Sequence, residues 1–191
     1  MTEPLYRDAY LAEAPGRVTG HTPEGGIVLD ASVFYPTGGG QPGDSGWLDW
    51  AGGSLSVATT VKGEGAAVVL VPGEPVPLPP VGAEVFQRLD WGRRHRHMRV
   101  HTALHLLSVV IPLPVTGGQI GAEKGRLDFD MPEAPEDRDA LEAALNDLVA
   151  RDLSVCGGTH VASTGEIGRL VFGKIEKKGR QNRRVSLHLA D

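Results

Sequence analysis

Four side chains of this sequence have the types and the spacing of metal ligands. His101 and His105 stand four residues apart, and Cys156 and His160 repeat that spacing in the stretch "CGGTH". Residues i and i+4 of a helix share a face, so both imidazoles of the first pair can reach one ion. Each pair alone is weak support for a site. Paired histidines are commonly solvated, and a lone cysteine is commonly a small buried hydrophobe.

Together the pairs supply one thiolate and three imidazoles, which suit a borderline-soft, tetrahedral ion such as Zn²⁺. The two glycines after Cys156 let the backbone turn tightly enough for both side chains to converge. No HExxH motif is present, which argues against a zinc peptidase. Two other uses stay open. One is a Cys–His nucleophile pair, which leaves His101 and His105 without a role. The other is a structural zinc knuckle, although such sites normally use more thiolates.

Composition points to a globular protein of the cytoplasm. Of the 191 residues, 40% are apolar and 23% are charged, as in ordinary soluble domains. No apolar run is long enough to span a membrane, and the first residues do not have the pattern of a secretory signal. The single cysteine excludes an internal disulfide bond.

Charge is unevenly distributed along the chain. The formal net charge is -5, but five of the 19 Lys and Arg residues lie in 88–99 and six lie in 174–184. A local basic field attracts a polyanion whatever the total charge. These stretches therefore suggest a nucleic-acid partner, with two solvated faces as the alternative.

The chain changes character near residue 90. Before it, short apolar runs alternate with turn residues, which predicts a small antiparallel barrel or sandwich. After it, we expect helices packed on an antiparallel sheet, so the whole chain is predicted to be α+β, with domains at 1–90 and 91–191. The expected elements are a helix over 97–111 that ends before Pro112, a strand over 126–131, a helix over 136–152, and a hairpin of 166–178 and 183–190.

The two ligand pairs also carry a resemblance. "HMRVHTALHLL" and "CGGTHV" resemble the paired HxxxH and CxxxH motifs of the alanyl-tRNA editing family, which is related to the editing domain of alanyl-tRNA synthetase. "FYPTGGGQPGDSG" (34–46) is similar to the glycine-rich motif of that family's N-terminal β-barrel, and further similar stretches extend from about residue 26 onward.

The resemblance implies a zinc-dependent deacylase of mischarged tRNA(Ala), chiefly seryl-tRNA(Ala) and to some degree glycyl-tRNA(Ala). It implies one zinc ion held by His101, His105, Cys156 and His160, and we expect His160 to be the loosest ligand. We expect a monomer. The rival functions are a tRNA-binding accessory module with a structural zinc, and an unrelated zinc hydrolase of small esters.

Substrate contacts are expected at two places. A hydroxyl-recognising pocket can discriminate serine from alanine, and Thr116 and Gln119 are the candidates for it, with Thr102 behind them. Each of these can instead bond its own backbone. Gly38, Gly39 and Gly40 would let the backbone approach the site closely, and Gln41 could reach across. For tRNA binding, the candidates are Arg93, Arg94, Lys177, Lys178 and Arg183.

One connection departs from the family's pattern. The helix over 136–152 runs into the cysteine stretch without the Gly, Asn or Pro that normally ends a helix. The family ordinarily places an extra segment there. Either this chain is a natural short form, or a segment near 150–156 is missing from the sequence; we favour the second interpretation.

Overall fold

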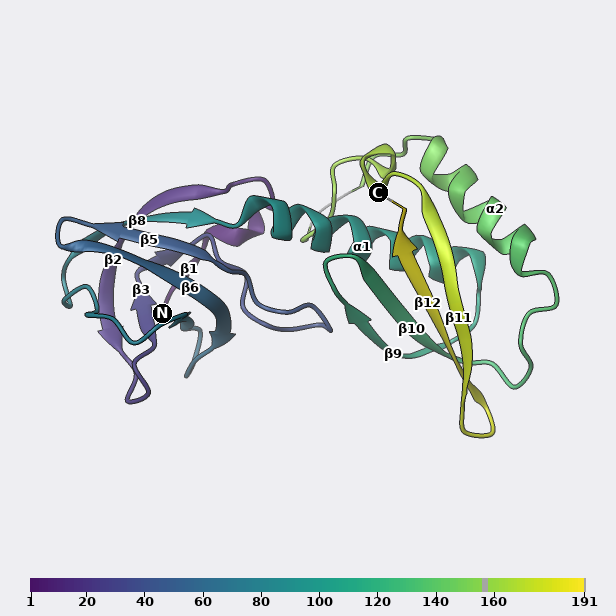
Figure 1. Ribbon diagram of the computed structural model, residues 1–191, viewed down its shortest axis with the longest axis horizontal. Coiled ribbons are helices and arrows are strands. Elements are labelled where there is room, and N and C mark those ends of the chain that lie inside the picture. Colours follow the sequence, from purple (N-terminus) through teal and green to yellow (C-terminus); the bar gives the residue numbers. More distant parts are fainter. Residues whose placement is uncertain (156–157, 191) are drawn as a thin grey trace. The chain divides into compact units, whose positions relative to one another are not determined.

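The computed structural model describes residues 1–155 and 158–190, so Cys156 and Gly157 lie outside the described residues. The chain divides into two compact units (Figure 1). The first consists of residues 1–38 and 42–94, and the second of residues 39–41 and 95–191. No helix among the described residues is long and apolar enough to cross a membrane.

The first unit is a closed antiparallel barrel with strand order β2-β3-β7-β6-β5-β8, as the alternating runs predicted. Its strands are β2 (Glu13–His21), β3 (Ile27–Leu29), β5 (Gly46–Trp50), β6 (Gly53–Lys62), β7 (Val68–Pro72) and β8 (Glu84–Leu89). A separate parallel pair and a short 3-10 helix complete the unit: β1 (Glu3–Pro4), β4 (Ala31–Ser32) and η1 (Leu5–Arg7). Closure leaves the barrel without exposed sheet edges.

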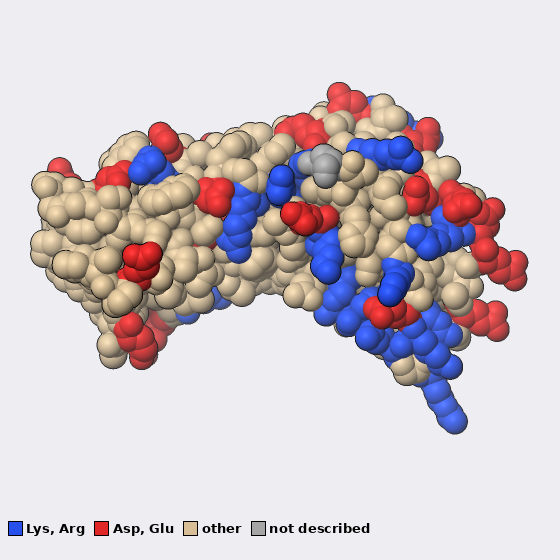
Figure 2. Space-filling model, viewed as in Figure 1, with Lys and Arg blue, Asp and Glu red and all other residues tan. Residues whose placement is uncertain are grey.

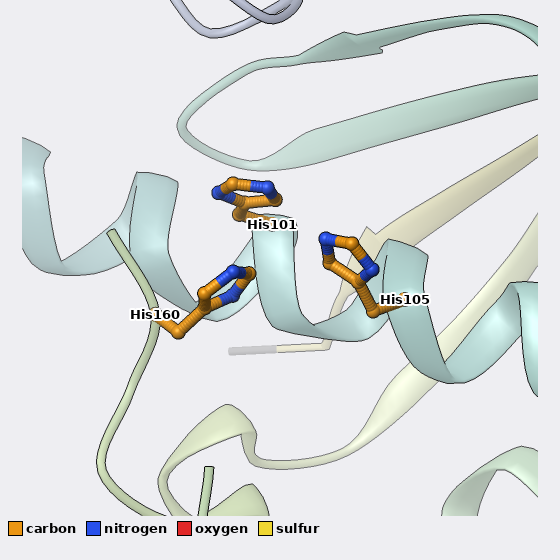
Figure 3. Close-up of side chains that lie close together, drawn as sticks. All are labelled: His101, His105 and His160. Atoms are coloured by element: carbon orange, nitrogen blue, oxygen red, sulfur yellow. The ribbon is translucent and has the colours of Figure 1, made fainter. Parts of the chain in front are cut away.

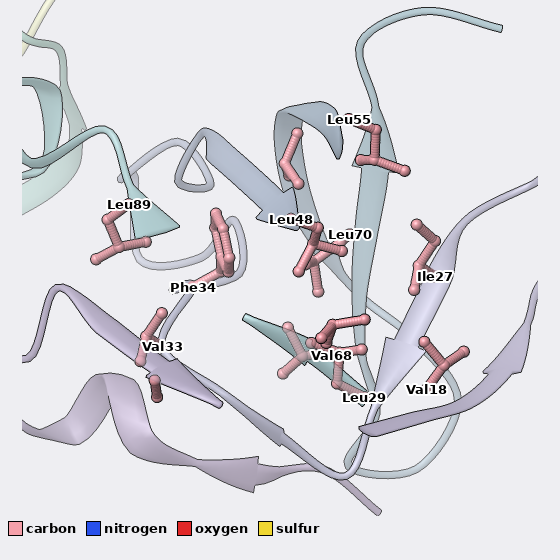
Figure 4. Packing of buried hydrophobic residues seen from close by; sticks show 13 residues of the cluster. Val18, Ile27, Leu29, Val33, Phe34, Leu48, Leu55, Val68, Leu70 and Leu89 are labelled. Atoms are coloured by element: carbon pink, nitrogen blue, oxygen red, sulfur yellow. The ribbon is translucent and has the colours of Figure 1, made fainter. Parts of the chain in front are cut away.

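The barrel encloses an apolar core (Figure 4). Ile27, Leu29, Leu48 and Leu70 are fully buried, because alternate residues of each strand point inward. Strand β2 was not expected, since it contains a proline and two glycines. It forms because it alternates burial in the same way and pairs with β3 and β8.

The second unit is a four-stranded antiparallel sheet of order β11-β12-β10-β9 with helices against it. This arrangement confirms the α+β class. The elements are α1 (Trp91–Val110), β9 (Val115–Ile120), β10 (Lys124–Asp130), α2 (Arg138–Ala150), η2 (Thr164–Ile167), β11 (Leu170–Lys178) and β12 (Asn182–Leu189). Helix α1 begins after Asp90, whose carboxylate accepts a hydrogen bond from the Arg93 amide at 3.1 Å, and it ends before Pro112.

Helix α1 packs closely on β10 at a glycine. A Cβ atom on Gly125 would lie 2.6 Å from Cγ1 of Val100 and 3.0 Å from Cδ1 of Leu104. Any larger residue would force Val100 and Leu104 to shift, so glycine permits this close approach. The contact fixes α1 against the sheet, and with it His101 and His105.

Helix α2 runs along β11, the outer strand of the sheet (Figure 1). Asn146 donates to the Leu170 carbonyl and accepts from the Leu170 amide, both at 2.9 Å. Glu142 accepts from the Phe172 amide at 2.8 Å, and Arg138 donates to the Phe172 carbonyl. Residues 138, 142 and 146 share one helical face, so polar side chains take the place of a neighbouring strand.

The connection after α2 contains turn chemistry that the sequence pattern did not reveal. Asp152 adopts a positive φ of 51°, a conformation that Asp tolerates better than most residues. Its carboxylate then accepts a hydrogen bond from the Gly165 amide at 3.0 Å. The join contains none of the Gly, Asn or Pro residues that normally end a helix, and Asp152 makes the turn in their place. The predicted missing segment near 150–156 falls at the step to Cys156, which lies outside the described residues.

Candidate metal centre

The fold brings three of the four predicted ligands together (Figure 3). Helix α1 presents His101 and His105 one turn apart. His160 lies in a loop over 158–163, where the Ala162 carbonyl accepts from the Val155 amide at 2.9 Å and Ser163 pairs with Ser154. The ligand atoms of the three histidines all lie within 4.8 Å of one another. Such a cluster can hold a metal ion.

The environment keeps two of these imidazoles neutral. Burial, followed by the neighbouring rings of His160 and His105, lowers the pKa of His101 to about 4. Burial and His105 also lower the pKa of His160. A neutral imidazole has a lone pair to offer, and this is the form that binds metal ions. The ring centroids of His101 and His160 are only 4.1 Å apart, a spacing that is unfavourable for two charged rings.

A hydroxyl group fixes which nitrogen of His160 carries the proton. The Thr102 hydroxyl donates to the Met98 carbonyl at 2.9 Å. Its oxygen, 3.2 Å from His160 Nδ1, therefore accepts from that nitrogen. With its proton on Nδ1, His160 has its lone pair on Nε2. Thr102, first considered as a substrate hydroxyl, instead bonds α1 and a histidine of the loop.

His101 has the corresponding partner in Thr159. The Thr159 hydroxyl lies 3.2 Å from His101 Nδ1 and donates to Oε1 of Gln41 at 2.9 Å. Each motif thus contributes a threonine that bonds the other motif's histidine: Thr102 follows His101 but bonds His160, and Thr159 precedes His160 but bonds His101. Sequence reasoning missed both roles. The only signal was a threonine directly beside one histidine of each motif.

An open cleft of about 610 Å³ adjoins the histidines. His101 and His105 line it, together with the predicted substrate residues Thr116, Gln119, Gly39 and Gly40. These residues belong to the second unit, so the glycine-rich segment does come close to the histidines. At Gly40, φ is 81° and a Cβ atom would lie 2.9 Å from the Gly118 carbonyl oxygen.

The side chains of Thr116 and Gln119 have protein partners as well. The Thr116 hydroxyl donates to the Asp128 carbonyl at 3.1 Å, and Oε1 of Gln119 accepts from Nε of Arg126 at 3.2 Å. Gly38 is not among the cleft residues; its carbonyl accepts from the Tyr35 hydroxyl at 3.2 Å in the first unit. Gln41 is 1% exposed and does not line the cleft either.

The structure separates the predicted tRNA contacts into two groups. Arg94 is only 1% exposed; it forms a buried ion pair with Asp44 and donates to the Val33 carbonyl at 2.8 Å. Its guanidinium cannot reach a phosphate, so this part of the prediction is corrected. Arg93, half-buried, donates to the Gly43 carbonyl at 2.9 Å.

The other candidates lie on the hairpin of β11 and β12. Lys177 and Lys178 are exposed, whereas Arg183 is half-buried and donates to the Pro132 and Asn182 carbonyls. Figure 2 shows Lys and Arg side chains gathered over this hairpin. We call the following set the basic hairpin: Lys174, Lys177, Lys178, Arg180, Arg183 and Arg184.

Comparison with known proteins identifies the family. The profile of the threonyl and alanyl tRNA synthetase second additional domain matches residues 149–186, and that of class II (A) tRNA synthetases matches residues 13–93. An alanyl-tRNA editing protein AlaX-M of Methanosarcina barkeri is 32% identical over 243 positions, covering 100% of both chains. This chain belongs to the alanyl-tRNA editing protein family.

Two further proteins are similar to this chain. The AlaX-M protein of Pyrococcus horikoshii is 35% identical, with 99% of this chain and 98% of that protein covered. An alanine–tRNA ligase of Pyrobaculum neutrophilum is 31% identical over 92% of this chain but only 25% of the ligase. The alignment with the Methanosarcina barkeri protein has 243 positions against 191 residues here, so that family member carries residues that this chain lacks.

Proposed function

We propose that this protein is a trans-editing hydrolase that removes serine, and to a lesser degree glycine, from mischarged tRNA(Ala) with the help of a zinc ion. The observation that carries the proposal is the convergence of His101, His105 and His160 at a cleft, in a chain of the alanyl-tRNA editing family. The cleft volume of about 610 Å³ is in the range of small-molecule sites, which span about 300–1,000 Å³.

The donor chemistry supports zinc. Three imidazoles, two of them with Nδ1 at 3.2 Å from a threonine hydroxyl, suit this borderline ion. Cys156 is proposed as the fourth ligand from its sequence spacing. When bound, zinc supplies a Lewis acid that polarises the ester or activates water. His101, His105 and His160 would hold the ion.

Discrimination is assigned to the polar lining of the cleft. Alanine differs from serine by one hydroxyl, and a site that bonds a substrate hydroxyl can reject an analogue without it by roughly 10⁴-fold or more. Thr116 has donated its own proton to a carbonyl, which leaves its oxygen as an acceptor for a serine hydroxyl. Gln119 lies on the same strand and completes the proposed pocket.

The deciding experiment measures hydrolysis of seryl-tRNA(Ala) and glycyl-tRNA(Ala), with alanyl-tRNA(Ala) as the control, before and after treatment with a chelator and then with added zinc. We expect seryl-tRNA(Ala) to be hydrolysed fastest and alanyl-tRNA(Ala) to be spared. Activity should disappear on chelation and return with zinc. A protein that binds tRNA(Ala), unfolds on chelation and hydrolyses none of the three would be an accessory module with a structural zinc.

A further inference from the structure

The two threonines that bond histidines differ in the second hydrogen-bond partner of their hydroxyl groups. The second partner of Thr102 is the Met98 carbonyl, a backbone oxygen that can only accept a hydrogen bond. The proton of that hydroxyl is therefore committed, and so is the tautomer of His160. The second partner of Thr159 is the side-chain amide of Gln41, which has an acceptor on one side and a donor on the other.

The orientation of the Gln41 amide therefore contributes to the tautomer of His101, beside a backbone hydrogen bond of Thr159 that also favours a proton on this ring. With Oε1 toward Thr159, the hydroxyl donates to Gln41 and must accept from His101 Nδ1. If the amide were reversed, its NH₂ group would donate to Thr159, and the hydroxyl would donate to His101 Nδ1. The proton of His101 would then sit on Nε2, and no lone pair would remain there for an ion.

Gln41 also keeps an unmet hydrogen-bonding group. Its side chain is 1% exposed, and among the described residues its Nε2 atom has no hydrogen-bond partner. A buried donor without a partner is destabilising, so a residue that served only packing would be apolar. The backbone beside it is fixed, because the Ile120 amide donates to the Gly40 carbonyl at 2.8 Å.

We propose that Gln41 is a positioning residue: its side-chain oxygen orients the Thr159 hydroxyl, which holds the proton of His101 on Nδ1 and leaves the Nε2 lone pair for the metal ion. This inference rests on the proposed function insofar as His101 is a metal ligand. It gives the glutamine of the glycine-rich segment a role at the metal centre in place of the expected contact with substrate.

The primary test reads the tautomers in the metal-free, full-length protein. Two-bond ¹H–¹⁵N correlation spectra distinguish a histidine with its proton on Nδ1 from one with its proton on Nε2. We expect both His101 and His160 to carry it on Nδ1. In the variant Gln41→Met, which keeps length but removes the acceptor, His101 should shift toward Nε2–H while His160 stays unchanged. A wild-type His101 with its proton on Nε2 would overturn the proposal.

The second readout is zinc affinity, measured by competition with a chelating dye. Loss of a partner that orients a ligand typically weakens metal binding by about 10–100-fold, and we expect that range for Gln41→Met. Thr159→Val should weaken binding similarly, whereas Thr159→Ser, which keeps the hydroxyl, should restore it. If Gln41→Met fails to fold, the comparison of Thr159→Val with Thr159→Ser tests the proposal instead. Equal zinc affinity in Thr159→Val and Thr159→Ser would show that the Thr159 hydroxyl does not orient His101, and would refute the proposal.

The matched control is Gln87→Met in the barrel. Gln87 is also fully buried, and its amide accepts from the Val33 amide at 3.2 Å and donates to the Ala31 carbonyl at 3.1 Å. Its loss should lower stability at least as much as that of Gln41 but leave zinc affinity and the His101 tautomer unchanged. If the two glutamine variants weaken zinc binding equally, Gln41 is merely structural. A protein with the expected tautomers and affinities but no deacylase activity would instead refute only the proposed function.

Discussion

At the scale of single residues, the position of one proton decides whether a histidine can bind a metal ion. Spacing in the sequence is sufficient to pair His101 with His105, because helical periodicity is local. It could not show that Gln41 bonds Thr159, 118 positions away, since nothing in a linear pattern reports such a contact. For the same reason the sequence suggested that Arg94 is a surface cation, although its guanidinium is buried in an ion pair with Asp44.

Cys156→Ala should abolish both zinc binding and deacylation. Its thiolate is the only anionic donor of the proposed set, so its loss removes the one ligand whose negative charge offsets that of the ion. We expect zinc content after dialysis to fall close to zero and hydrolysis of seryl-tRNA(Ala) to be lost. Circular dichroism should show that the secondary structure persists. Normal zinc content and a wild-type rate in this variant would remove Cys156 from the site.

The acid stability of the protein should depend on Asp128. Hydrogen bonds from Arg184, and then from Arg126, hold the pKa of Asp128 below its ordinary value of 3.8. A lowered folded-state pKa stabilises the protein fully above the ordinary value, and this contribution disappears as pH falls through the folded value. Asp128→Asn should therefore unfold more easily in urea at pH 7, by no more than about 1 kcal/mol, because solvent screens the ion pair.

The same substitution should flatten the loss of stability below about pH 4, because the variant no longer has this carboxylate to protonate. Asp147→Asn is the control, since Asp147 is 59% exposed and pairs with Arg151 on the surface of α2. Its urea midpoints should follow those of the wild type at each pH. Identical acid profiles for the wild type and Asp128→Asn would contradict the assignment.

At the scale of elements, α2 protects the edge of the sheet with hydrogen bonds as well as with apolar contacts. Leu145 and Val149 are its buried residues, and Asn146 lies between them in the sequence. From the sequence the apolar spacing predicted the helix correctly. The polar residues among those positions looked like solvated surface, because the sequence alone does not show that β11 is an edge strand.

Asn146→Ala should destabilise the protein by about 2–3 kcal/mol, because it leaves the amide and the carbonyl of Leu170 without their bonds. The unpaired edge should also promote aggregation on heating. Thermal unfolding and light scattering measure the two effects. Asp147→Ala, one position along on the exposed side, should change stability by less than about 0.5 kcal/mol. Equal effects of the two substitutions would show that the edge bonds contribute nothing.

The boundaries of an element could be predicted where a nearby residue such as proline sets them. They could not be predicted where pairing with a distant strand sets them. Helix α1 ends before Pro112 as expected, but it begins at Trp91, six residues earlier than the apolar pattern suggested. Strands β2 and β9 were missed because glycine and proline weaken their strand pattern. The barrel itself could be predicted, since several short alternating runs can bury one face only by closing on one another.

At the scale of the whole molecule, charge is concentrated rather than balanced. The net charge of -5 hides a hairpin on which six cations gather, with Glu176 as its one acid. Two of these cations are already engaged: Arg184 bonds Asp128, and Arg183 bonds the Pro132 carbonyl. The exposed lysines are therefore the best candidates for phosphate contacts.

Lys177→Gln and Lys178→Gln together should raise KM for seryl-tRNA(Ala) while leaving kcat nearly unchanged. The slope of log binding constant against log salt should fall by about 0.7–0.9 for each phosphate that a lysine no longer neutralises. Arg7→Gln, an exposed charge of the first unit, is the matched control and should leave the slope unchanged. A salt slope that is the same in all three proteins would mean that these lysines are only solvated.

The three residues 39–41 have a consequence for how such a protein can be divided. They are encoded among the barrel residues yet belong to the compact unit of the histidines. A gene fragment for residues 95–191 would therefore encode His101, His105, Cys156 and His160 but not the glutamine that orients one of them. During synthesis, residues 39–41 leave the ribosome before any part of the sheet of the second unit. The unit that carries the histidine cluster is therefore encoded in two separate stretches of the gene, and no single cut can separate it intact.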